Sequence, residues 1–286
     1  MSIPKPVILD ISEHQLPSDI NYDKLAGAID GVIVRIQYGS RYLDKHYKTH
    51  IAAFQKRGIP VAVYAWIRGI NKADMEQEAI DFYNRAKGYN PVMWWLDVEE
   101  QSMADMRGGT EAYRAKLKSL GAKKIGVYVA NHLYSQFNLD MSKFDGIWIP
   151  TYGSNNGQYN GSNPTATGNY NLHQYTSNSV LPGYNGPLDL SRIAKGSFSD
   201  FFGTTAPSNP SAPEKQKKKA GNVMLLFRPE GSAEVYLLIG NQYTHIKSEA
   251  DLKTVKVMMT QAGYDTHIHT DLTQIKYLKK LAKEVK

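Results

Sequence analysis

The sequence predicts an α/β fold: an irregular (β/α) barrel over residues 1–203, followed by a small α+β domain. Short apolar runs typical of strands alternate with amphipathic helical patterns, and several of those runs end in an acid. Up to eight strand candidates in 203 residues fit a small barrel of this class. These candidates are residues 7–11, 31–37, 61–66, 92–98, 125–130, 146–150, 172–175 and 188–191.

The connections between the strand candidates show where the barrel should be regular. Residues 45–56, 72–87 and 110–120 carry apolar side chains at three- and four-residue spacing, as amphipathic helices do. Helical crossovers of this kind indicate parallel strands. After Tyr152 the segment GSNNGQYNGSNPTATGNYN is too rich in Gly and Asn for a helix, so we expect the later crossovers to be loops.

A change of composition separates the two domains. Residues 204–222, TTAPSNPSAPEKQKKKAGN, contain three prolines and no apolar periodicity, which is typical of an extended linker. Residues 223–286 form the second domain, whose expected elements are strands over 223–227, 234–239 and 242–246, a helix from Ser248 to Gly263 and a final helix from Thr270.

Composition excludes several classes of protein. The chain has no cysteine, which rules out a disulfide framework and a thiolate metal site. His267 and His269, one residue apart, and His245 are more typical of ordinary strand or loop residues than of a metal site, so we expect neither a metal nor a cofactor. No stretch approaches the roughly 20 apolar residues of a membrane span. The start, MSIPKPVILD, lacks the apolar core of a signal peptide, so we expect synthesis in the cytoplasm without one.

The net charge of +7 does not predict nucleic-acid binding. Lys and Arg exceed Asp and Glu by two in residues 1–203, by three in 204–222 and by two in 223–286. The excess is thus concentrated in the linker, and basic and aromatic residues are not interleaved as a nucleic-acid module requires. We expect the Lys215 to Lys219 run to be a solvated spacer, with contact to anionic polymers as the alternative.

The most informative segment is WWLDVEE, Trp94 to Glu100, which places two carboxylates in an apolar run. Because strand side chains alternate between faces, Trp95, Asp97 and Glu99 should share one face and the intervening residues the other. Burying acids costs several kcal/mol unless they are paired or hydrogen-bonded, so this pattern favours function. Asp97 and Glu99 are therefore the candidate catalytic pair.

Two further strand candidates end in an acid. Asp10 follows the run VIL, and Asp189 follows GPL. Taken singly, such an Asp is more often a helix N-cap or a turn residue. In a barrel of this class, however, the C-terminal strand ends build the active site. We therefore expect Asp10, Asp189 and Tyr152 to converge with the Asp97 and Glu99 pair.

Aromatic segments accompany these acids in order along the chain: YAW, GVYVA, IWIPTYG and HQYT. In combination they resemble glycoside hydrolase family 25, the lysozymes of phage endolysins and bacterial autolysins, over roughly residues 4–203. His173 departs from the aromatic residue expected there, which weakens a sugar-stacking role at this position. The resemblance implies substrate binding by Tyr64, Trp66, Tyr128, Trp148, Tyr152, Gln174 and Tyr175. Packing is the alternative role for such tyrosines on apolar strands.

The resemblance implies a peptidoglycan hydrolase that cleaves the β-1,4 bond between N-acetylmuramic acid and N-acetylglucosamine. Glu99 is the expected general acid, with its pKa raised by partial burial beside Asp97. Asp97 is the expected ionised partner, which orients or stabilises the substrate acetamide in the family's favoured mechanism. Asp10 and Asp189 are expected to position neighbouring groups of the site and to maintain the arrangement of charges around Glu99. Both retaining and inverting courses remain open.

The resemblance also implies partners and a place of action. Peptidoglycan is the expected partner, reached from the cytoplasm through a separate holin if the protein is an endolysin. Residues 223–286 are expected to bind the cell wall and concentrate the enzyme on it, with self-association left open. Two other classes stay in play: a glycosidase on another N-acetylated polymer such as chitin, and a non-catalytic glycan-binding protein.

Overall fold

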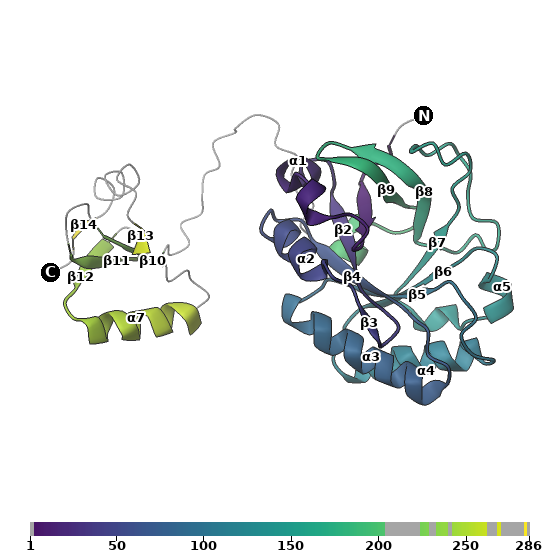
Figure 1. The fold of residues 1–286 in the computed structure, drawn as a ribbon, viewed down its shortest axis with the longest axis horizontal. Coiled ribbons are helices and arrows are strands. Elements are labelled where there is room, and N and C mark those ends of the chain that lie inside the picture. Colours follow the sequence, from purple (N-terminus) through teal and green to yellow (C-terminus); the bar gives the residue numbers. More distant parts are fainter. Residues whose placement is uncertain are drawn as a thin grey trace. The chain divides into compact units, whose positions relative to one another are not determined.

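The computed structural model describes residues 3–203, 224–228, 233–239, 242–261, 268–269 and 283–284 (Figure 1). The chain divides into two compact units, Met1–Pro210 and Ser211–Lys286, and each is described here by itself. The expected linker, residues 204–222, lies outside the described residues, and so does almost all of the final helix expected from Thr270.

The first unit is a barrel of eight strands in the order β1-β9-β8-β7-β6-β5-β4-β2, closed by pairing of β2 with β1, and β3 is added at the edge of β2. The strands are β1 Ile8–Ile11, β2 Gly31–Tyr38, β3 Tyr42–Leu43, β4 Val61–Trp66, β5 Trp94–Val98, β6 Ile125–Val129, β7 Gly146–Pro150, β8 Leu172–Leu181 and β9 Tyr184–Ile193. The predicted irregular α/β barrel is thus confirmed.

The expectation of parallel strands is wrong at the end of the barrel. Strands β1, β2 and β4 through β8 pair in parallel, whereas β9 is antiparallel to both β8 and β1. Only two residues, Pro182 and Gly183, join β8 to β9. So short a connection permits a hairpin but no parallel crossover, and Gly183 provides the positive φ of 100° at this turn.

Helices cover the outside of the barrel, most extensively α2, α3 and α4 (Figure 1). Asn71 caps α3 by accepting from the Asp74 amide, and Asp105 caps α4 by accepting from the Gly108 amide. Between β7 and β8, residues 151–171 contain no helix, as the Gly- and Asn-rich sequence predicts. The helices are α1 Tyr22–Ala26, α2 Tyr47–Gln55, α3 Lys72–Ala86, α4 Met106–Ser119, α5 Tyr134–Phe137 and α6 Phe198–Phe202, with 3-10 turns at Pro17–Asp19, Lys87–Tyr89 and Met141–Lys143.

Strand alternation divides the apolar residues into a core inside the barrel and a core between barrel and helices. Trp95 lies inside, whereas Trp94 and its alternate neighbours on β5 pack under the helices, as predicted. A Cβ on Gly126 would lie 2.3 Å from the Trp95 ring, so glycine makes room for this indole. The helix α6 places Phe201 and Phe202 against the first residues of β7 and β2, which fills the N-terminal end of the barrel.

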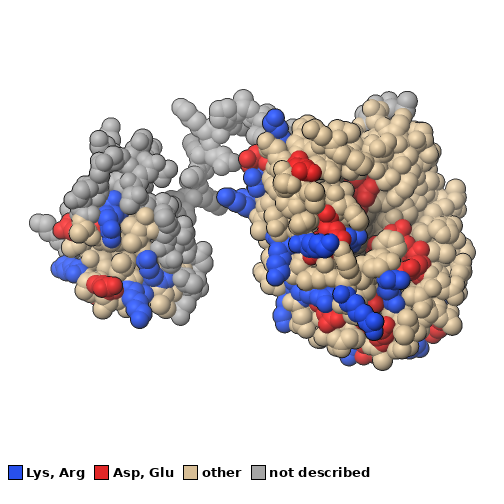
Figure 2. All heavy atoms as spheres, in the orientation of Figure 1, with Lys and Arg blue, Asp and Glu red and all other residues tan. Residues whose placement is uncertain are grey.

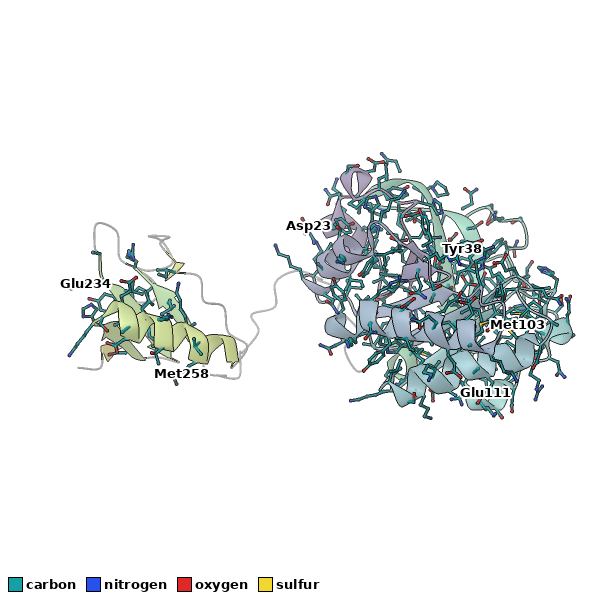
Figure 3. The ribbon with its side chains drawn as sticks, turned by 60° about the horizontal axis from the view of Figure 1, so that its bottom comes forward. Asp23, Tyr38, Met103, Glu111, Glu234 and Met258 are labelled. Carbon is teal, nitrogen blue, oxygen red and sulfur yellow. The ribbon has the colours of Figure 1, made fainter. Side chains whose placement is uncertain are left out.

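The second unit is a five-stranded sheet in the order β13-β10-β11-β12-β14 with one described helix. Ser248 caps this helix by accepting from the Asp251 amide, as predicted. Met259 is fully buried against the sheet, while Met258 points away and is 61% exposed (Figure 3). The elements are β10 Met224–Phe227, β11 Val235–Ile239, β12 Gln242–Ile246, α7 Glu249–Gln261, β13 Ile268–His269 and β14 Lys283–Glu284.

Charges of both signs are mixed on the surface of the first unit. On the face shown in Figure 2, Lys and Arg side chains lie among Asp and Glu side chains and do not form a patch of one sign. The lysine run expected in the linker falls outside the described residues. None of the helices in the described ranges is both long and apolar enough to cross a membrane.

Candidate active site

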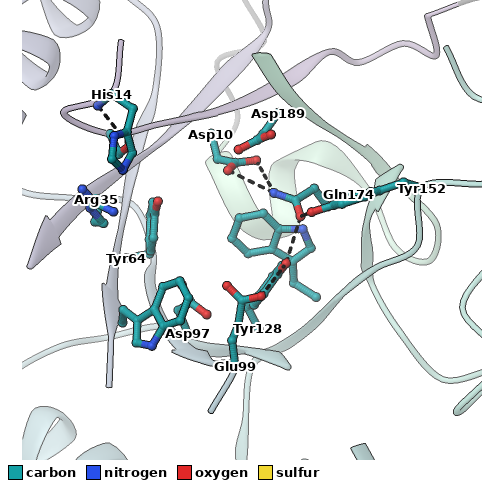
Figure 4. Close-up of a pocket in the computed structure, with 13 residues that line it drawn as sticks. Asp10, His14, Arg35, Tyr64, Asp97, Glu99, Tyr128, Tyr152, Gln174 and Asp189 are labelled. Carbon is teal, nitrogen blue, oxygen red and sulfur yellow. Dashed lines mark hydrogen bonds between the residues drawn. The ribbon is translucent and has the colours of Figure 1, made fainter. Parts of the chain in front are cut away.

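A pocket of about 220 Å³ lies at the C-terminal ends of the parallel strands (Figure 4). All four predicted acids line it: Asp10 from β1, Asp97 from β5, Glu99 just after β5, and Asp189 from β9. Six of the seven predicted substrate-binding residues line it as well, namely Tyr64, Trp66, Tyr128, Trp148, Tyr152 and Gln174.

Tyr175 is the predicted residue that does not line this pocket. Since Gln174 points into the barrel, the next side chain on β8 points outward, and Tyr175 is 2% exposed in the core outside the barrel, where its ring contacts Tyr159. Its hydroxyl has no hydrogen-bond partner among the described residues. The prediction that Tyr175 binds substrate is therefore corrected, because strand alternation turns it away from the pocket.

His173 also points outward and is fully buried. Burial lowers the pKa of its imidazole to about 4, so the ring is neutral. A neutral imidazole donates from one nitrogen and accepts at the other. Here Nε2 lies 2.8 Å from the Thr151 carbonyl oxygen, and Nδ1 accepts from Arg192 Nε at 3.1 Å. His173 therefore links β8 to Thr151 and Arg192 by hydrogen bonds. Because its ring is fully buried, it cannot stack on a sugar.

Asp97 and Glu99 form a coupled pair of acids. Burial raises the pKa of both carboxyls, and the charge of Glu99 raises that of Asp97 further. The hydrogen bond between them raises the pKa of Asp97 and lowers that of Glu99. The pKa of Glu99 is raised, as the sequence predicts for a general acid, and Asp97 is the more deeply buried of the two, at 4% exposed.

Asp10 and Asp189 form a second pair, directly opposite each other in the register of β1 with β9. Burial raises the pKa of Asp189 to about 6, and burial followed by the Asp189 charge raises that of Asp10 well above its usual range. Gln174 Nε2 donates to both Asp10 oxygens, at 3.0 and 3.1 Å, which holds that carboxyl in place.

Gln174 connects the two pairs of acids. Its Oε1 accepts from the Tyr128 hydroxyl at 2.9 Å and from the Tyr152 hydroxyl at 2.8 Å. The Tyr128 hydroxyl also lies 3.5 Å from Glu99 Oε2. A hydrogen-bonded chain thus runs from Asp10 through Gln174 and Tyr128 to Glu99 (Figure 4).

The sequence reasoning missed three residues of the pocket: Ser12, His14 and Arg35. Arg35 is the one Lys or Arg among the lining residues, and it is held by Asp44 at 3.2 Å and Glu13 at 3.5 Å. The signal was available, since Arg35 interrupts the apolar run GVIVRIQ just as Asp97 interrupts its own. Among the residues that the structure describes, no group of three or more His, Asp or Glu has the geometry to hold a metal ion.

Comparison with known proteins agrees with this architecture. Residues 9–184 match the model of the glycosyl hydrolases family 25. A comparison with curated proteins gave no match. Among solved structures, the chain is 42% identical to GHIP, a virulence factor and glycosyl hydrolase 25 of Streptococcus pneumoniae participating in host cell invasion; the TM-score is 0.67, and the match covers 69% of this chain and 93% of that one.

Two further structures are similar. The catalytic domain of endolysin ply40 from bacteriophage P40 of Listeria monocytogenes is 24% identical with a TM-score of 0.64, over 71% of this chain and 100% of that one, which shows the fold alone. Autolysin LytC of Streptococcus pneumoniae, solved with a synthetic peptidoglycan ligand, is 26% identical with a TM-score of 0.53, over 65% of this chain and 46% of that one. Since the family match spans more than half of its length, this chain belongs to glycosyl hydrolase family 25, a family of lysozymes and muramidases.

Proposed function

We propose that this protein is a peptidoglycan muramidase that cleaves the β-1,4 bond between N-acetylmuramic acid and N-acetylglucosamine. The observation that carries the proposal is the Asp97 and Glu99 pair, two hydrogen-bonded acids with raised pKa values at the open end of the barrel. Glycoside hydrolysis needs such a pair, one carboxyl to protonate the leaving oxygen and one group to stabilise the positive charge that develops at the anomeric carbon.

Asp97 has the geometry to hold the substrate acetamide. Its buried Oδ1 has no hydrogen-bond partner among the described residues, so an N–H donor from the substrate would satisfy it. An acetamide N–H donated to this oxygen favours the ionised form of Asp97, and the proton of the pair is then held on Glu99. Substrate binding thus favours the protonated Glu99 and the ionised Asp97 that catalysis requires.

The reaction follows from this arrangement. Glu99 donates its proton to the glycosidic oxygen as the bond to the anomeric carbon breaks, and the acetamide carbonyl oxygen attacks that carbon while Asp97 holds the N–H. Water then opens the cyclic intermediate and returns a proton to Glu99. Asp10, which Gln174 holds in place, and Asp189, opposite it in the strand register, supply negative charge near the oxocarbenium-like centre.

We further propose that the second unit, Ser211–Lys286, binds the cell wall, and that the enzyme acts on the wall after release from the cytoplasm that makes it. A wall-binding module raises the local concentration of the enzyme on an insoluble substrate. Sedimentation with insoluble peptidoglycan should carry down the full chain but not a chain that ends at Pro210. Both should hydrolyse soluble glycan strands equally, and equal sedimentation would refute the wall-binding role.

The test of the central proposal is mass spectrometry of fragments released from purified peptidoglycan by the wild type and by Glu99→Gln. We expect new reducing ends on N-acetylmuramic acid from the wild type alone. Reducing N-acetylglucosamine ends, or activity on chitin oligomers with none on peptidoglycan, would support the other glycosidase. Binding to peptidoglycan without any cleavage would support a glycan-binding protein.

A further inference from the structure

We infer that a second cavity, beside the catalytic pocket, binds the stem peptide that peptidoglycan carries on its muramic acid, through an amino group and a carboxylate of that peptide. The inference rests on the proposed function, because the peptide is part of the proposed substrate. The cavity has a volume of about 290 Å³, compared with 220 Å³ for the catalytic pocket. It is lined by Tyr38, Gly39, Ser40, Arg41, Arg68, Ile70, Asp74 and Glu78.

The cavity adjoins the catalytic pocket through a pair of aromatic rings. Tyr38 at the end of β2 pairs in register with Trp66 at the end of β4, and their ring centroids are 5.1 Å apart. Trp66 lines the catalytic pocket and Tyr38 lines the second cavity. The Arg68 guanidinium lies 4.4 Å from the Tyr38 ring centroid and also binds Glu100, next to the catalytic Glu99. A substituent on a sugar bound in the catalytic pocket can therefore reach the second cavity.

The charged side chains of the cavity complement a ligand that carries both a cationic and an anionic group. Arg41 and Asp74 each lack an ion-pair partner within the described ranges. Glu78 is 2% exposed, accepts from the Arg68 amide at 3.0 Å, and has its pKa raised by burial to about 7. An ammonium group bound beside Glu78 would favour the ionised form of its carboxyl. The guanidinium of Arg41 can donate two parallel hydrogen bonds to a carboxylate.

The backbone keeps this cavity open. Gly39 has a φ of 63°, in the left-handed region that favours glycine, and a Cβ on it would point at Glu78 Oε1, 3.4 Å away. At the rim, Ile70 is 71% exposed and offers an apolar contact. Stem peptides combine alanine methyl groups, a free carboxylate and, where they are not cross-linked, the amine of a diamino acid. A further neutral sugar ring would leave the charge of Arg41 unmatched, whereas Asp74 already accepts from the Ile70 amide at 3.1 Å.

The experiment compares soluble, uncross-linked glycan strands that carry their stem peptides with the same strands stripped by an amidase. The readout is kcat/KM for release of muramic-acid reducing ends by the full chain. We expect the wild type to prefer peptide-bearing strands about tenfold, the effect of roughly one charge-assisted hydrogen bond. Arg41→Gln and Asp74→Asn should each reduce that preference toward one while cleaving stripped strands within about twofold of wild type.

The matched control is Lys118→Gln, which removes an exposed charge from the last turn of α4. It should keep the full preference. The inference is overturned if the wild type cleaves both strands equally, if the two cavity variants keep the preference, or if the control loses it equally. If the wild type releases no muramic-acid reducing ends from either strand, the proposed function itself fails.

Discussion

Strand β5 and the hairpin β8–β9 supply the same pocket in different ways. At the end of β5 the acids lie two residues apart in sequence, Asp97 on the strand and Glu99 just after it, so alternation alone places both on one face. On the other side of the pocket, Asp189 of the hairpin meets Asp10 of β1 only through strand pairing, across a sequence separation that spans nearly the whole barrel. A local pair can thus be identified from sequence, whereas a pair formed by register becomes evident only in the fold.

The largest expected difference between the two sides concerns the proton donor. Glu99→Gln should lower kcat by about 10³-fold, because an amide cannot supply the proton that the leaving oxygen needs. The assay is the release of reducing sugar from soluble glycan strands. Glu76→Gln, on the outer surface of α3, is the control and should retain wild-type kcat. An equal loss in both variants would mean that the assay reports stability and not proton donation.

The second prediction tests whether the pair formed by register acts through charge. The charge of Asp10 adds to burial and to Glu99 in raising the pKa of Asp97. Replacing both Asp10 and Asp189 by Asn should therefore lower the pKa of the catalytic pair. The basic limb of the kcat/KM profile, where the acid loses its proton, should move to lower pH, with a loss of kcat on the order of tenfold to a hundredfold. An unchanged basic limb would mean that Asp10 and Asp189 position neighbouring groups and do not act through their charge.

The third prediction concerns the link between the two sides. Gln174→Met keeps the side-chain volume close to that of Gln but removes the donor to Asp10 and the acceptor for Tyr128 and Tyr152. Leaving a buried carboxyl without its donor should lower the free energy of unfolding by about 2 kcal/mol. Urea unfolding measures this, and kcat/KM should fall about tenfold. A stability equal to that of the wild type would show that water replaces the amide.

The smallest effect on activity and stability is expected at Tyr175, the residue after Gln174. Tyr175→Phe removes a buried hydroxyl that has no partner among the described residues, so activity and stability should remain at or slightly above wild type. Tyr152→Phe, which removes a donor to Gln174, should lower kcat/KM measurably under the same conditions. If Tyr175→Phe were the more damaging change, the outward orientation of Tyr175 would be contradicted.

Several features of this protein follow from its sequence because they depend on local periodicity. Alternation of apolar runs with helical patterns predicted the barrel, and one residue pattern, Trp95 to Glu99, predicted which side chains face its interior. The Gly- and Asn-rich segment after Tyr152 predicted a crossover without a helix. Each of these inferences needs only the geometry of a strand or helix and the composition of a few consecutive residues.

The tertiary structure decided what depends on partners distant in sequence. Only the hairpin direction showed that β9 runs antiparallel and brings Asp189 opposite Asp10. Only burial showed that the pKa of Asp97 is raised as well as that of Glu99, and that Tyr175 and His173 face the outer core. Register, burial and the field of neighbouring charges are properties of residues that meet in space, and a linear pattern does not contain them.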